Sequence, residues 1–77
     1  MSWTIERQHV GEHAGEWYYE GVQSAYGLIC GYALSLPEAK VRLAISEAEL
    51  LEAPYPPRVI EAMLADPEHF AADWPDP

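Results

Sequence analysis

The first third of the chain alternates hydrophobic and polar positions in short runs, as β-strands do. Residues 3–10 begin with this alternation, with Trp3 and Ile5 on one side and polar residues on the other. Residues 16–22 are rich in aromatic side chains, which favour strands. Between these runs, segment 11–15 has a glycine at each end, and glycine adopts the positive φ that turns need. The pattern predicts two strands joined by a turn.

A third run, residues 25–34, has one face of large side chains and one face of small ones. The even positions carry Tyr26, Leu28, Cys30, Tyr32 and Leu34, and the odd positions carry Ala25, Gly27, Ile29, Gly31 and Ala33. The small face lets a helix or another backbone approach closely. The large face could be core or an exposed partner surface, and the periodicity leaves both readings open.

Helical periodicity begins after Ser35. The pattern Ser35-x-x-Glu38 predicts a capping box, in which Ser35 accepts from a free N–H group and Glu38 reaches back to the Ser35 N–H. Pro37 is tolerated in the first turn of a helix. An apolar stripe follows at helical spacing, made by Val41, Ala44, Ile45, Ala48 and Leu51 and widened by Leu36, Leu43 and Leu50. The pattern predicts a helix over about 36–53, with a mainly solvent-facing side formed by Lys40, Glu47, Glu49 and Glu52.

Prolines divide the rest of the chain. The Pro-Tyr-Pro-Pro segment 54–57 ends the helix as a stiff connector. Short helices are predicted at about 57–65 and, after the cap Asp66-Pro67, at about 67–73. The fold class is therefore α+β, a three-stranded antiparallel sheet followed by two or three helices packed on one face, in a single domain of residues 1–77. With so few helices, one sheet face stays partly exposed, which usually marks an interface.

The net charge of the chain limits the partners that it can bind. The formal net charge is −9, from 13 acidic and 4 basic residues. This argues against direct binding to nucleic acid or to an anionic membrane, and favours a basic protein partner or simple solubility. No apolar run is long enough to span a bilayer, and the start lacks a signal-peptide pattern. With one unpaired cysteine, a cytoplasmic location is expected.

Candidate chemistry is sparse. Cys30 is the only cysteine, which excludes disulfides within the chain and zinc sites built on two thiolates. His9 and His13, with Glu12 or Glu16, could ligate a metal, but a third fixed ligand is not evident. A nucleophilic Cys30 would need a nearby base, and the sequence places none. A small metal or thiol enzyme is thus an alternative; the main expectation is no enzyme, no catalytic residue, no cofactor and no metal.

Two groups of side chains are candidates for partner binding. Acidic residues of the second half would form a negative ridge if they share a surface, and such a ridge could occupy a basic groove that normally holds nucleic acid. An ordinary solvated helix face is the alternative. Strand aromatics are either core or protein interface, and acidic neighbours disfavour base stacking. The predicted partner-binding residues are Glu47, Glu49, Glu52, Glu61, Trp17, Tyr19, Tyr26 and Tyr32.

Two segments also resemble a known family. A hairpin leads into the strand Trp17-Tyr18-Tyr19-Glu20-Gly21-Val22, and a capped helix starts at Ser35-Leu36-Pro37-Glu38-Ala39. In these features the chain resembles the β-β-β-α domain of HicB-type antitoxins over about two-thirds of its length. It lacks the Pro-Asp-Leu-Pro-Gly-Cys-like stretch that this family usually has between its second and third strands, so no functional residue is carried over.

One hypothesis is an antitoxin-like or structural module that dimerises through its aromatic sheet face, favoured by the small core and by the strand from Tyr26 to Leu34, which is apolar on one side. The chain is also similar in style to small, acidic, motif-free phage-encoded inhibitors, among them anti-CRISPR proteins. That likeness and the charge together favour a small acidic inhibitor that occupies the basic, nucleic-acid-facing surface of a protein partner. The self-associating module is the alternative.

Overall fold

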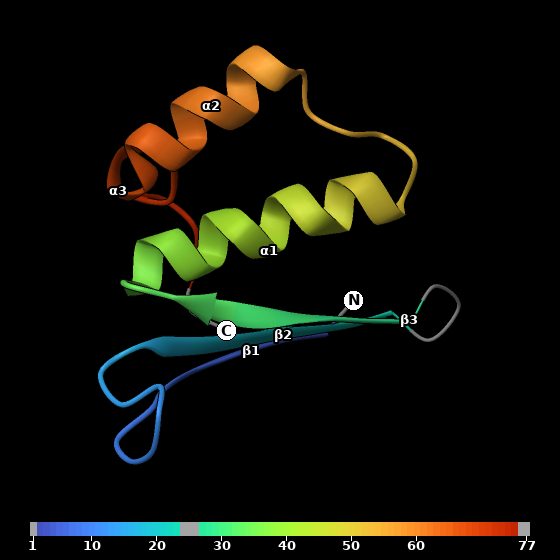
Figure 1. Ribbon diagram of the computed structural model, residues 1–77. Helices are drawn as coiled ribbons and strands as arrows, with labels where there is room; N and C mark the ends of the chain where they lie inside the picture. The colour runs from blue at the N-terminus through green and yellow to red at the C-terminus, as the bar shows by residue number, and fades with distance from the viewer. Residues whose placement is uncertain (1, 24–26, 76–77) are drawn as a thin grey trace.

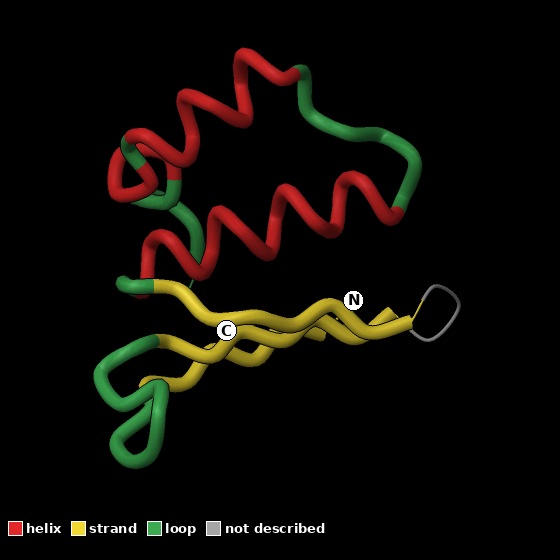
Figure 2. Tube along the Cα trace, in the orientation of Figure 1, coloured by secondary structure: helices red, strands yellow, loops and turns green. Residues whose placement is uncertain are grey.

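The computed structural model describes residues 2–23 and 27–75 of the chain. Three strands come first and three helices follow (Figure 1), which confirms the predicted α+β class. Loops connect each element to the next, as the trace in Figure 2 shows. The elements are β1 (Ser2–Arg7), β2 (Trp17–Gln23), β3 (Gly27–Ala33), α1 (Leu36–Leu50), α2 (Pro57–Ala65) and α3 (Pro67–Phe70).

Three elements end three residues before their predicted ends. β1 ends at Arg7 rather than near residue 10, because the backbone of Gln8 already pairs with Glu16 and Gly15 across the turn. α1 ends at Leu50 rather than near residue 53, and Glu52 behind it has a φ of 60°. A residue that precedes proline disfavours helical geometry, which explains an end ahead of the Pro54 connector. α3 is a single turn that stops at Phe70 instead of residue 73.

The sheet has the order β1-β2-β3, and both strand pairs are antiparallel. The register aligns Ile5 with Tyr19 and Tyr19 with Gly31. Because side chains alternate between the two faces of a sheet, odd-numbered residues of all three strands share one face and even-numbered residues share the other.

Helix α1 packs on the odd face. Leu43 and Ala39 of α1 form a buried cluster with Tyr19 and Ala33 of the sheet. Trp3, Ile5, Trp17 and Ile29 surround this cluster, half-buried. The small face of β3 therefore lies against the helix, as its glycine and alanine allow, and the large face of β3 is turned away from it.

A second cluster holds the other helices. Val41 and Ile45, on another side of α1, pack with Met63 of α2 and with Ala71. Among the described residues, α2 and α3 contact α1 and each other, and neither packs on a strand. Figure 1 shows the result as three tiers, with the sheet below, α1 in the middle and α2 with α3 above. All three helices of the described residues thus lie on one side of the sheet, and among them only α1 touches it.

Polar contacts at α1 partly follow the predicted pattern. Ser35 Oγ accepts a hydrogen bond from the Glu38 N–H at 3.2 Å, as a cap should. The Glu38 carboxylate accepts from the Leu34 N–H at 2.9 Å, not from the Ser35 N–H, and it also pairs with Arg42 at 2.9 Å. The expectation that Lys40 faces solvent is wrong: Lys40 is 6% exposed, and its Nζ donates to the Trp74 carbonyl at 3.3 Å.

Candidate functional site

The even face of the sheet is not covered by any helix in the described part of the chain, and we call it the open face. Three large apolar side chains stand on it and are strongly exposed: Val22 at 45%, Leu28 at 59% and Tyr32 at 42%. Uncovered apolar side chains on a small domain usually mark an interaction surface. The cross-strand rows of the open face are Ser2-Val22-Leu28, Thr4-Glu20-Cys30 and Glu6-Tyr18-Tyr32.

The aromatic end of the open face is closed by a loop residue. The ring of His13 stacks on that of Tyr32, with ring centres 3.7 Å apart and planes at 5°. The ring of Tyr18, on the neighbouring strand, also contacts that of Tyr32, with ring centres 5.5 Å apart and planes at 58°. His13 Nδ1 also lies 3.1 Å from a carboxylate oxygen of Glu16, which fixes the ring over the sheet. The contact of His13 with Tyr32 was not predicted from the sequence, where His13 was a candidate metal ligand, because nothing local to His13 indicates Tyr32.

A hydrogen bond on the open face perturbs one tyrosine. The Tyr18 hydroxyl donates to Glu20 Oε1 at 2.8 Å, two residues along the same strand. This bond to a carboxylate holds the phenol proton, and together with desolvation and the negative charge of Glu20 it raises the pKa of Tyr18 from 10.0 to about 12. The fold therefore favours the neutral phenol of Tyr18 up to a higher pH than for a free tyrosine.

Replacing Glu20 with glutamine is expected to lower the pKa of Tyr18 from about 12 toward 10.0, since the amide carries no charge. The folded state favours the protonated phenol, so any stabilisation from this bond is fully present below about pH 10 and is lost as pH rises through about 12. An absorbance titration of tyrosinate measures the change, with Tyr18→Phe to assign the late-titrating group. An identical titration curve for Glu20→Gln would contradict the assignment.

The predicted aromatic surface is only partly assembled. Tyr32 lies on the open face, whereas Tyr19 is 9% exposed and sits in the core under α1. Trp17 is half-buried against the same cluster, and Tyr26 lies outside the described residues. The strand register turns Trp17 and Tyr19 toward the helix and away from Tyr32, so for Trp17 and Tyr19 the core reading of the strand aromatics holds.

The four predicted acidic contacts do not form one ridge. Glu47 and Glu49 are two residues apart on α1, and at about 100° per residue they point in nearly opposite directions. Glu47 is half-buried and accepts a hydrogen bond from Trp3 Nε1 at 2.6 Å, while Glu49 is exposed. Glu52 lies beyond the end of α1 and Glu61 on α2, both exposed. Glu47 and Glu49 thus lie on different sides of α1, which excludes a single ridge made of all four side chains.

Metal and thiol chemistry gain no support from the described geometry. Within residues 2–23 and 27–75, no three His, Cys, Asp or Glu side chains gather closely enough to hold a metal ion. His9 is exposed in the turn after β1. Cys30 is exposed in the middle row of the open face, where its cross-strand neighbour is Glu20.

The described helices are also too short or too polar for one of them to cross a bilayer. Comparison with known proteins found no matching family model, no matching curated protein and no matching solved structure.

Proposed function

We propose that this chain is a small acidic inhibitor that docks through its open face on the basic, nucleic-acid-facing surface of a protein partner. The observation that carries the proposal is the uncovered sheet face, with Val22, Leu28 and Tyr32 strongly exposed on it. Burial of exposed apolar side chains favours association, and tyrosine is enriched among the residues that carry most of the binding energy of an interface. The partner-binding role predicted for Tyr32 is kept, and His13 is added to it.

Charge supports a basic partner over the other occupants. The open face carries the carboxylates Glu6 and Glu20, and none of its described strand positions is Lys or Arg. A second copy of the chain would bring two molecules of net charge −9 together, with four carboxylates from their open faces. Nucleic acid itself is disfavoured for the same reason. A partner with a Lys- and Arg-rich surface would instead be attracted by the negative net charge of the chain and by the carboxylates of its open face.

The proposal assigns binding rather than catalysis to the chain, in the manner of the anti-CRISPR-like inhibitors that it resembles in style. The exposed free thiol of Cys30 fits action in a reducing compartment such as the cytoplasm. The antitoxin-like alternative shares the open face but gives it to a second copy of the chain, so one experiment separates the two.

A positive charge introduced on the open face tests the proposal. We expect Leu28→Lys to weaken capture of the partner by at least tenfold, because it removes an apolar contact and places a cation against a basic surface. Leu64→Lys is the matched control, since Leu64 is 39% exposed on α2, which touches no described strand. Capture of partners on the immobilised chain, read by mass spectrometry at rising salt, gives the comparison. The captured protein is then titrated with the wild-type chain in a nucleic-acid competition assay.

Three outcomes would contradict the proposal. Equal capture by Leu28→Lys and Leu64→Lys would remove the open face as the binding surface. An unchanged affinity of the captured protein for its nucleic acid would remove the inhibitory role. Recovery of only further copies of this chain, together with a dimer mass in solution, would transfer the open face to self-association.

A further inference from the structure

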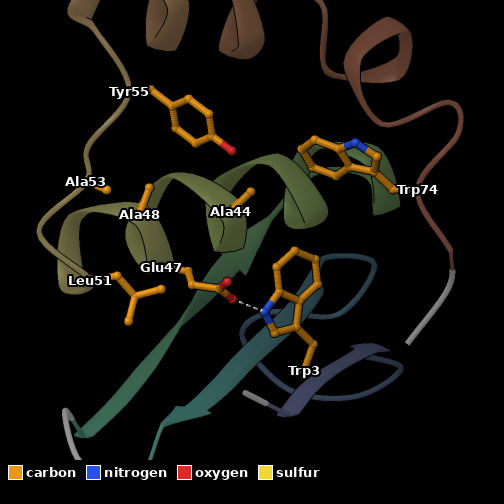
Figure 3. A pocket seen from close by; sticks show the side chains of 8 residues that line it. All are labelled: Trp3, Ala44, Glu47, Ala48, Leu51, Ala53, Tyr55 and Trp74. Carbon is orange, nitrogen blue, oxygen red and sulfur yellow. Dashed lines mark hydrogen bonds between the residues drawn. The ribbon is translucent and has the colours of Figure 1, made fainter.

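A hollow of about 470 Å³ lies on the α1 side of the sheet. It is bordered by β1, by α1, by the connector between α1 and α2, and by the chain after α3 (Figure 3). Three aromatic rings stand around it, those of Trp3, Tyr55 and Trp74, and Glu47 of α1 lies among them. This volume is within the range of pockets that bind small molecules.

Two alanines of α1 have side chains short enough to leave space for the hollow. Ala44 and Ala48 are four residues apart and therefore share one side of α1, which Glu47 also borders. The helical spacing puts both alanines in the predicted apolar stripe of α1. Ala44 and Ala48 line the hollow instead, and their short side chains leave room between the aromatic rings.

The hollow combines aromatic walls with one negative charge. Glu47 Oε2 accepts from Trp3 Nε1 at 2.6 Å, and no other described residue donates a hydrogen bond to this carboxylate. None of the residues that line the hollow is Lys or Arg. The negative faces of aromatic rings attract cations, and tryptophan does so most strongly. The aromatic walls and the Glu47 carboxylate thus both favour a cationic ligand.

We propose that this hollow binds an alkylated ammonium group, either on a free small molecule of the choline type or on a methylated lysine side chain. The alkyl groups would lie against the rings, and the positive charge would be balanced by Glu47. A hydrated metal ion fits poorly, because hard cations require several oxygen ligands and the hollow offers one carboxylate. An anion would be repelled by Glu47. The site uses none of the open-face residues and extends beyond the inhibitory function proposed above.

The test titrates choline into the intact chain and follows the three indole N–H resonances by NMR, at constant ionic strength set with sodium chloride. We expect saturable shifts for Trp3 and Trp74, which line the hollow, and none for Trp17, which does not. The neutral probe 3,3-dimethylbutanol has the same shape as choline without the charge. Choline should bind at least tenfold more tightly than this alcohol.

Glu47→Gln separates the role of charge from that of shape. The amide oxygen can still accept from Trp3 Nε1, so the hollow keeps its form while its charge is removed. We expect choline binding to weaken about tenfold, whereas binding of 3,3-dimethylbutanol stays unchanged. Ala44→Leu fills the hollow and should abolish binding of both probes, with circular dichroism to verify the fold.

A peptide that carries trimethyllysine then distinguishes the two sources of the ammonium group. Tighter binding of this peptide than of choline assigns the site to a side chain, and weaker binding assigns it to a free small molecule. Three results would overturn the proposal: no saturable binding of choline or peptide, equal affinity for choline and the neutral alcohol, or equal choline affinity of the wild type and Glu47→Gln. Because the assay needs no macromolecular partner, its failure leaves the inhibitory function untouched.

Discussion

Leu43→Ala is expected to lower the free energy of unfolding by about 3 kcal/mol, within the range that buried leucine-to-alanine changes produce. Leu43 is 0% exposed and lies where α1 packs on Tyr19 and Ala33 of the sheet. The alanine would lose the transfer free energy of the removed methyl groups and would leave a cavity between helix and sheet. Since α1 is the only described helix that touches the sheet, no other helix can close this gap.

The expected loss is large relative to the total free energy of unfolding of a small domain. A single core in a chain of this size supplies about 3–5 kcal/mol, so Leu43→Ala should leave much of the population unfolded without denaturant. Urea unfolding measures the change as a shift of the midpoint at unchanged slope. Leu64→Ala is the matched control: Leu64 is 39% exposed on α2, and we expect it to cost less than about 1 kcal/mol. Equal midpoints for the two variants would show that the contact of α1 with the sheet does not limit stability.

What the sequence predicted correctly is mostly local. The helix start at Ser35 depends on residues within four positions, and the cap forms between Ser35 and Glu38 as expected. The alternation in the strands also lies within single short runs, which is why the α+β class could be predicted. The exact partner of the Glu38 carboxylate was wrong by one residue, because Ser35 and Leu34 both offer N–H groups near the helix start.

What the sequence could not predict depends on contacts between distant segments. Lys40 lies on a helix side that α1 alone would expose, but Trp74, 34 positions away, returns to accept its hydrogen bond. The partner of Trp3 is Glu47, 44 positions away. No periodicity encodes such pairings, since they depend on where the chain after α3 runs. The hollow between Trp3, Tyr55 and Trp74 was missed for the same reason.

The placement of the strand aromatics shows a more specific difficulty. Trp17, Tyr18 and Tyr19 are consecutive, so alternation must send Tyr18 to the face opposite the other two. Which face the helix covers depends on β3, where Gly31 and Ala33 provide the space. The small face of β3 was the signal that could have placed Tyr19 in the core, once the register aligned Tyr19 with Gly31.

Gly31→Ala is therefore expected to destabilise the fold by about 2 kcal/mol, although alanine is no worse than glycine for an ordinary strand. Tyr19 lies across the strand pair over Gly31, and a Cβ at position 31 would come within 2.6 Å of Tyr19 Cζ. Tyr19 is 9% exposed and packs against α1, so its ring has little room to move. The backbone of Gly31 is not in the left-handed region, so the cost comes from packing alone.

A double-mutant cycle isolates this contact. Tyr19→Leu removes the ring that the new Cβ would meet, so adding Gly31→Ala in that background should cost less than about 0.5 kcal/mol or be stabilising. Urea unfolding of the four proteins gives the coupling energy, which we expect to be about 2 kcal/mol. Gly31→Ala should also raise the exposure of Tyr19, measured by second-derivative absorbance. An undiminished cost of Gly31→Ala in the Tyr19→Leu background would show that the ring is not the reason for glycine at position 31.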